Sequence, residues 1–194
     1  MNTIVEQTFK IGVIGHRDLD NTEKHSYTHF CCHRLLVGIK QKYSSVNAIS
    51  AISNGADSIF AQSAIYLGIH LESIIPFRQF SSDFQEDLAF ERYKTLRSQS
   101  KYESSANFSE RSNLAYRKSM EWLVFKSHAV VAVWDNREEG SIGGTWEAVS
   151  LCIKIGKPMI HIDNKNKKLN FYFNKGDGYY SHQNLSVEQI IRQL

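Results

Sequence analysis

The chain has 194 residues, of which 42% are hydrophobic, and a formal net charge of +3. This length and apolar content predict a single globular domain, residues 1–194, with a sizeable core. The small charge gives no sign of nucleic acid as a partner, so no direct DNA binding is expected. No apolar run of about 18 residues and no signal-peptide pattern is present, and the three cysteines form no CxxC pair, so we expect a cytoplasmic protein without membrane contact.

The first predicted strand covers residues 9–15 and is followed by a turn that contains Gly15, His16 and Arg17. Gly12 and Gly15 have the spacing GxxG and not GxGxxG, so a dinucleotide fingerprint is not present. Arg17 follows the carboxyl end of the strand, where it can meet an anion or form a surface salt bridge.

Residues 22–43 have the apolar spacing of a helix that covers the sheet. His25, His29 and His33 lie at intervals of four residues, which places three imidazoles on one face of this helix. Two of them can share a metal ion, but neither a carboxylate nor a third ligand is evident nearby. We therefore expect a solvated polar face and no metal site.

A second strand is predicted at residues 46–53, followed by a turn and a helix. Ser53, Asn54, Gly55 and Asp57 follow this strand and are candidate ligand contacts. Asp57 has two interpretations: it caps the helix, which we favour, or it binds ribose hydroxyls or a base edge.

A third strand is predicted at residues 70–75, and Phe77 just after it is a candidate to stack on a base. Residues 79–112 are rich in Ser, Gln, Glu, Lys and Arg, with apolar residues at helical spacings. We expect a polar helical excursion without clear strands, of the kind that forms a lid or an interaction surface.

A helix is predicted at residues 113–127 and presents Tyr116 and Arg117 near its start. Cations at a helix start oppose the helix dipole, which favours a ligand role for Arg117. A partner carboxylate such as Glu121 is the alternative explanation.

The next strand is the β-branched run at residues 130–133, and Trp134 at its end is a candidate to stack on a base. A polar loop with Gly143 and Gly144 follows, and Thr145 opens a helix. The glycines let a ligand approach the backbone, and the helix start favours an anion such as phosphate. Paired glycines at such a position also occur purely as tight-turn residues.

Residues 158–162 predict a fifth strand, residues 169–173 a short edge strand, and residues 186–189 the start of a final helix. Alternating strands and helices predict an α/β fold, a single Rossmann-like, doubly wound parallel sheet with helices on both faces. Its ligand crevice lies outside the carboxyl ends of the strands, where all the candidate residues fall. We therefore expect a nucleotide or phosphorylated nucleoside as ligand and no cofactor.

Five segments in matching order resemble motifs of the LOG-like superfamily, whose members include cytokinin-activating phosphoribohydrolases and the nucleotide-sensing SLOG domains. The resemblance covers most of residues 8–162, and the segments are residues 11–17, 53–57, 74–77, 131–135 and 143–145. It implies a cytosolic sensor of a nucleotide or nucleotide-derived signal, in an antiphage or stress signalling system. It also implies a homodimer and a separate effector protein as partners.

The enzymes of this superfamily carry the patterns PGGxGTxxE and RKxxM, in which the Arg and the final Glu serve cleavage of the N-glycosidic bond. Here Ala148 stands where the final Glu belongs, and Glu147 comes one residue early. The resemblance thus implies an alternative function, a nucleoside 5′-monophosphate phosphoribohydrolase with Glu147 and Arg117 as catalytic residues. A structural α/β domain with an empty crevice is the third alternative.

Overall fold

The computed structural model describes residues 7–19, 22–138, 142–176 and 178–194. Residues 1–6, which carry no signal-peptide pattern, and part of the predicted glycine loop, residues 139–141, lie outside the described residues. The strands are β1 Phe9–Gly15, β2 Val46–Ser50, β3 His70–Phe77, β4 Tyr102–Phe108, β5 Ala129–Val133, β6 Met159–Asp163, β7 Lys168–Asn174 and β8 Tyr179–His182. The helices are α1 Thr22–Lys42, α2 Ala56–Tyr66, the 3-10 helix η1 Phe80–Asp83, α3 Asp87–Ser98, α4 Asn113–Lys126, α5 Thr145–Lys154 and α6 Val187–Gln193.

The eight strands form one sheet in the order β4-β3-β2-β1-β5-β6-β7-β8. Strands β1 to β6 pair in parallel, and β7 and β8 add an antiparallel extension. The chain runs outward from β1 to β4 on one side and then returns to place β5 on the other side of β1. This reversal of direction between β1 and β5 is the position where an open α/β sheet binds its ligand.

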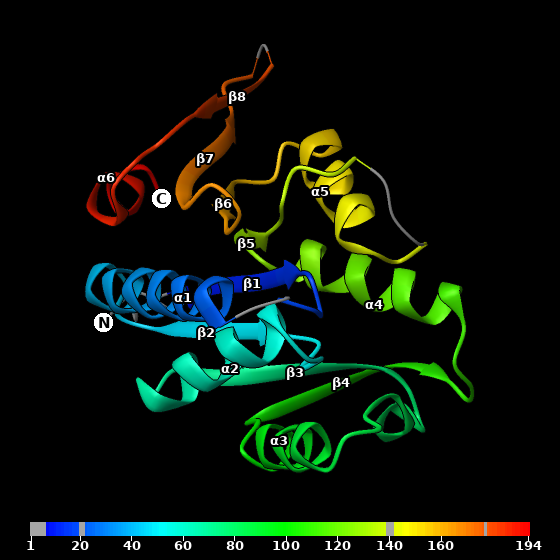
Figure 1. Cartoon of the computed structure of the whole chain (residues 1–194). Helices are drawn as coiled ribbons and strands as arrows, with labels where there is room; N and C mark the ends of the chain where they lie inside the picture. The colour runs from blue at the N-terminus through cyan, green and yellow to red at the C-terminus, as the bar shows by residue number, and fades with distance from the viewer. Residues whose placement is uncertain (1–6, 20–21, 139–141, 177) are drawn as a thin grey trace, which may run out of the picture.

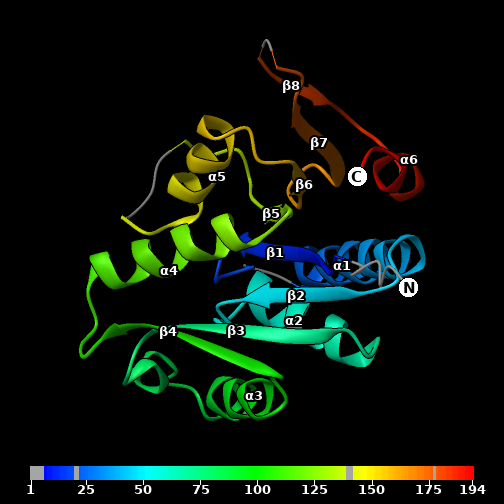
Figure 2. The same cartoon turned by 180° about the vertical axis from the view of Figure 1, so that it is seen from behind.

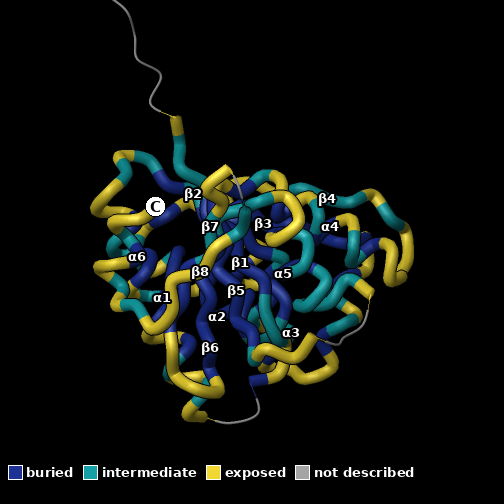
Figure 3. Tube along the Cα trace, turned by 90° about the horizontal axis from the view of Figure 1, so that it is seen from above, coloured by how far each residue is buried: buried dark blue, intermediate teal, exposed yellow. Residues whose placement is uncertain are grey.

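Helices cover both faces of the sheet, as predicted. Figure 1 shows α1 and α2 in front of the sheet with α6 beside α1, and Figure 2 shows α4 in front when the molecule is seen from behind. Side chains alternate between the two layers: Ile11 and Val13 pack in the core under α1 and α2, whereas Ile14 packs in the core under α4 and α5. Figure 3 shows the central strands as buried and the outer surfaces of the helices as exposed.

The cysteines belong to this core. Cys31, Cys32 and Cys152 are all buried and unpaired. Burial raises the pKa of the Cys31 thiol to about 11, so this side chain stays protonated as a small apolar group.

Two expectations need correction. The polar segment 79–112 contains a strand, β4, in addition to helices, and β4 pairs with β3 at the edge of the sheet. Residues 169–173 do form a strand, β7, but it is not at the edge because β8 pairs with it. β4 has no hydrophobic run because an edge strand keeps its outer side in solvent; its partly buried Ser104 hydroxyl donates a hydrogen bond to Glu72 of β3 at 3.1 Å.

Candidate functional site

A cavity of about 450 Å³ lies at the reversal point of the sheet, and we call it the central cavity. The end of β1, the segment after β2 and the first turns of α2, α4 and α5 form its walls. Its volume is within the range of small-ligand sites. Parallel strands bring their carboxyl ends to the same side of the sheet, so segments far apart in the sequence meet here.

Most of the predicted ligand residues line the central cavity. They are Gly15, His16, Arg17, Ser53, Asp57, Tyr116, Gly143, Gly144 and Thr145. These residues were chosen because they follow the carboxyl ends of parallel strands or open the next helix, and the fold brings them together in one cavity wall.

The glycine turn packs directly on the start of α4. Gly143 has φ of +78°, and a Cβ atom built on it would lie 2.7 Å from Tyr116 Cβ and 2.9 Å from the backbone nitrogen of Arg117. Only glycine fits this close approach without strain. Gly144 then caps α5, and Thr145 begins the helix at the cavity wall.

The two predicted catalytic residues meet, but they bind each other. Arg117 Nε lies 2.6 Å from Glu147 Oε1, in an ion pair without hydrogen-bond geometry, and the backbone N–H of Gly143 donates to the second oxygen of Glu147. Among the described residues that line the central cavity, neither Glu147 nor Arg117 occurs. The Glu147 carboxylate thus holds the glycine turn against α4.

Asp57 is a buried carboxylic acid in the wall of the central cavity. It is the second residue of α2, and its side chain makes no cap, because Gly55 is the N-cap residue. The favoured capping interpretation is therefore wrong. Burial raises the pKa of Asp57 to about 6, although hydrogen bonds from Ser53 and the charge of Arg17 act in the opposite direction. A perturbed carboxyl group in a cleft is typical of functional sites.

Four side chains form a charged cluster at the mouth of the central cavity. Asp83, whose side chain is 5% exposed, pairs with Arg17 at 3.0 Å and with Arg111 at 3.2 Å. The Tyr116 hydroxyl donates to the same carboxylate, and the Arg17 guanidinium lies over the Tyr116 ring at 4.9 Å from its centroid. Two guanidinium groups share one carboxylate, so the cluster keeps a net positive charge at the cavity.

His16, which follows β1, is held by a side chain that follows β5, across the point where the strand order reverses. Its Nε2 atom lies 3.0 Å from Asp135 Oδ1, which follows β5. Although burial acts to raise the pKa of Asp135, the contacts with His16 and Arg137 outweigh this effect and lower it. The pair therefore fastens the turn after β1 to the segment after β5.

The two residues predicted to stack on a base, Phe77 and Trp134, are not among the described residues that line the central cavity. Phe77 is completely buried and packs edge-on against Phe80 and Tyr116, so no face is free for a base. Trp134 is 6% exposed, stacks on Trp146 and donates its indole N–H to the Arg137 carbonyl. Both assignments are corrected: these side chains support the site from within the core.

Sequence reasoning missed Arg111, Asn113 and Asp83, and each of them lines a cavity. Arg111 and Asn113 flank Ser112, which caps α4 by accepting a hydrogen bond from the Ala115 backbone N–H. Recognising β4 in the sequence would have revealed Arg111 and Asn113, because both follow the carboxyl end of that strand.

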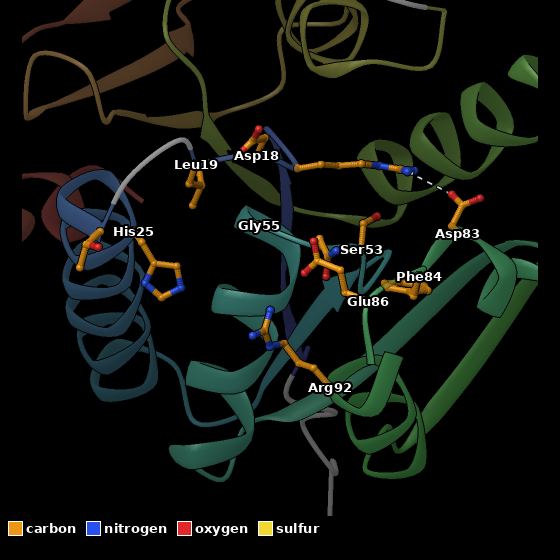
Figure 4. A pocket seen from close by; sticks show the side chains of 12 residues that line it. Asp18, Leu19, His25, Ser53, Gly55, Asp83, Phe84, Glu86 and Arg92 are labelled. Atoms are coloured by element: carbon orange, nitrogen blue, oxygen red, sulfur yellow. Dashed lines mark hydrogen bonds and ion pairs between the residues drawn. The ribbon is translucent and has the colours of Figure 1, made fainter. Parts of the chain in front are cut away.

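A second cavity of about 660 Å³, the outer cavity, adjoins the first. Figure 4 shows His25 on α1 and Arg92 on α3 pointing into it from different walls. Arg17 and Ser53 line both cavities, whereas the predicted residues Asn54 and Gly55 line the outer one alone.

Three histidines lie on α1 as predicted, and the rings of His29 and His33 stack with centroids 6.2 Å apart. In the described part of the chain, no group of three His, Cys, Asp or Glu side chains is arranged to hold a metal ion. Likewise, among the described residues no helix is both long and apolar enough to cross a membrane.

Comparison with known proteins gives matches to solved structures alone. No protein-family model and no curated protein matches the chain. DNA processing protein A of Streptococcus pneumoniae superposes with a TM-score of 0.58 and 10% identity, over 79% of this chain and 50% of that one. The corresponding protein of Helicobacter pylori gives 0.53 and 16%, over 79% and 64%. A protein designated TM1055 gives 0.51 and 14%, over 78% and 72%.

The fold and the cavity at its switch point define a Rossmann-like α/β protein. The chain shares its fold with these structures, and this is the Rossmann-like fold that the resemblance to the LOG-like superfamily implies. The chain spans about half of the S. pneumoniae protein and 64% of the H. pylori protein.

The expectation of no direct DNA binding is wrong. The H. pylori protein is described as having a single-stranded DNA binding mode, and it shares this fold. A mild net charge therefore does not exclude DNA, because local clusters such as Arg17 and Arg111 can provide positive charge where a ligand binds.

Proposed function

We propose that the protein binds a nucleotide or nucleotide-derived signal in the central cavity and acts as a sensor of that ligand. The observation that carries the proposal is the meeting of a glycine turn and helix start, Gly143 to Thr145, with a net positive cluster around Arg17 in a cavity of about 450 Å³. The backbone N–H groups of the helix start and the guanidinium groups favour phosphate. Asp57 and Ser53 in the same wall supply hydrogen-bonding groups for sugar hydroxyls or a base edge.

The enzymatic alternative has weaker support. A glycosidase needs a carboxylate that reaches the sugar, whereas Glu147 is paired with Arg117 and hydrogen-bonded to the turn. We therefore favour binding over hydrolysis. The resemblance to SLOG domains supports a single domain over residues 1–194 in the cytoplasm, a homodimer and signalling through a separate effector.

Calorimetric titration with AMP, GMP, CMP and UMP tests the proposal. We expect at least one to bind, and we expect Arg17→Ala and Arg111→Ala each to weaken it about tenfold or more, because a charge-assisted contact is worth about 1.5–3 kcal/mol. Arg192→Ala on α6 is the control: it removes the same charge from an exposed residue that lines neither cavity, and affinity should not change.

A short single-stranded oligothymidylate belongs in the same titration because the H. pylori protein of this fold is described as binding single-stranded DNA. If the oligonucleotide binds and none of the four mononucleotides does, the ligand is a nucleic acid and the sensor proposal fails. If neither kind of ligand binds, the central cavity is not a nucleotide site.

A further inference from the structure

The outward face of α4 carries a line of side chains that is open to solvent, and we call it the α4 stripe. It consists of Leu114, Lys118, Glu121 and Phe125, which follow one another at intervals of four, three and four residues and therefore lie along one side of the helix. Leu114 is 49% exposed and Phe125 is 60% exposed. Figure 2 shows α4 running across the front of the molecule when it is seen from behind.

The inward face of α4 has a different role. Leu123 and Val124 pack in the core under α4 and α5, and Tyr116 and Ser119 line the central cavity. These residues lie on the side of the helix opposite to the α4 stripe, because successive residues of a helix are about 100° apart. The apolar side chains of the stripe are therefore needed neither for the core nor for the cavity wall.

The order of residues in the α4 stripe makes it complementary to itself. Leu114 and Phe125 are equally far from the midpoint of the stripe, which lies between Ser119 and Met120. Lys118 and Glu121 are also equally far from it. If a second copy of α4 packs antiparallel about a two-fold axis at this midpoint, each apolar residue meets an apolar residue and each charge meets its opposite. The spacing of four, three and four is that of helices that pack along a seam.

The charges in the stripe select this antiparallel arrangement. Lys118 Nζ now lies 2.7 Å from Glu121 Oε2 of the same helix, and both side chains are partly exposed. In an antiparallel pair, Lys118 also comes opposite Glu121 of the second copy. In a parallel pair in register, Lys118 would instead face Lys118 and Glu121 would face Glu121, which repel each other.

We propose that the α4 stripe is the interface of a homodimer, in which α4 packs antiparallel against α4 of a second copy. The contact between Leu114 and Phe125 of the second copy, made twice, removes apolar surface from water at both ends of the stripe. This inference rests on the homodimer of the proposed function and names its interface. Because the inward face of α4 lines the central cavity, the two ligand sites of the dimer lie on the two sides of the paired helices.

Charge reversal on the stripe tests the proposal, with sedimentation velocity over a range of protein concentrations as the measurement. The wild-type protein should show a monomer–dimer equilibrium. Lys118→Glu and Glu121→Lys each place like charges opposite one another twice, so each should weaken self-association about tenfold or more. An equimolar mixture of the two variants should dimerise again, because the acidic stripe of one then faces the basic stripe of the other. A change within a single helix cannot produce this recovery.

Glu91→Lys and Lys94→Glu on α3 are the matched controls. Glu91 and Lys94 form an exposed ion pair with the same spacing of three residues and the same distance of 2.7 Å, and neither belongs to the α4 stripe. Both variants should dimerise as the wild type does. A dimer that persists in Lys118→Glu and in Glu121→Lys, or a mixture of the two that stays monomeric, overturns this interface while the homodimer stands. A wild-type protein that is monomeric at every concentration overturns the interface and the homodimer together, whereas nucleotide binding is decided separately by the calorimetric titration.

Discussion

Asp57 and Asp83 are both buried carboxyl groups at the site, but their surroundings differ. Asp83 has two guanidinium partners and a phenol, whereas Asp57 has hydrogen bonds from Ser53 and only the nearby charge of Arg17. Desolvation therefore dominates at Asp57 and raises its pKa to about 6. Above this pH the wall of the central cavity carries a buried negative charge, which opposes an anionic ligand.

This charge predicts a pH-dependent stability difference between Asp57→Asn and the wild-type protein. The folded-state pKa of about 6 lies above the unfolded value, so the folded state binds the proton more tightly. Stability is therefore lost as the pH rises between the two values. We expect the variant to be more stable by about 1–3 kcal/mol at about pH 8, with the difference vanishing near pH 4, in urea unfolding.

Asp135→Asn is the opposite-sign control for that measurement. The folded-state pKa of Asp135 is lowered, so its ionised form contributes stability above the unfolded pKa that is lost as the pH falls through the folded value. This variant should be less stable than wild type at about pH 8. A gap of the same sign for both variants would contradict the assigned pKa directions.

Among the secondary-structure elements, those with strong local patterns were predictable from the sequence. The β-branched run of β5 and the apolar β1 are buried on both faces, which makes them continuous hydrophobic segments. β4 was not predictable in this way, because its Tyr102 and Glu103 face solvent at the sheet edge and only long-range pairing with β3 makes it a strand.

The contact between the glycine turn and α4 predicts a large cost for Gly143→Ala. The new methyl group would meet Tyr116 and Arg117 N, and the residue would keep a positive φ. Overpacking and backbone strain together should lower the free energy of unfolding by about 2–4 kcal/mol and weaken nucleotide binding.

Gly176→Ala separates these two costs. Gly176 also has a positive φ, of +93°, but among the described residues a Cβ there would meet no atom within 4 Å. Its substitution should cost only the backbone strain, about 1–2 kcal/mol, without an effect on binding. Equal unfolding free energies for the two variants would show that the close approach of the turn to α4 is not needed.

In the whole molecule, the parallel order of the strands explains why much of the site could be foreseen. Residues that follow parallel strands converge whatever their spacing in the sequence, which correctly grouped Arg17, Ser53 and Thr145. The direction of each side chain was not foreseeable, since it depends on packing between layers. Phe77 also lies at the carboxyl end of a strand, but its side chain packs against Phe80 in an aromatic cluster.

The central cavity joins the two halves of the sheet, and this predicts global stabilisation by a bound ligand. Its walls include β1 and the segment after β2 on one side and the start of α5 on the other, so only the folded chain assembles the site and a ligand there stabilises the folded state. At 100 times its dissociation constant, a nucleotide should add about 2.7 kcal/mol and raise the melting temperature by roughly 5–10 °C for a chain of this size.

Scanning calorimetry with and without the best-binding mononucleotide measures this shift, and chromatography of the same sample reports the fate of the ligand. A sensor should return the nucleotide intact, because Glu147 is engaged by Arg117 and the glycine turn. Glu147→Gln should then change affinity only modestly. Release of free base that falls about 100-fold in Glu147→Gln would instead identify a hydrolase, in which this carboxylate leaves Arg117 to act in the transition state.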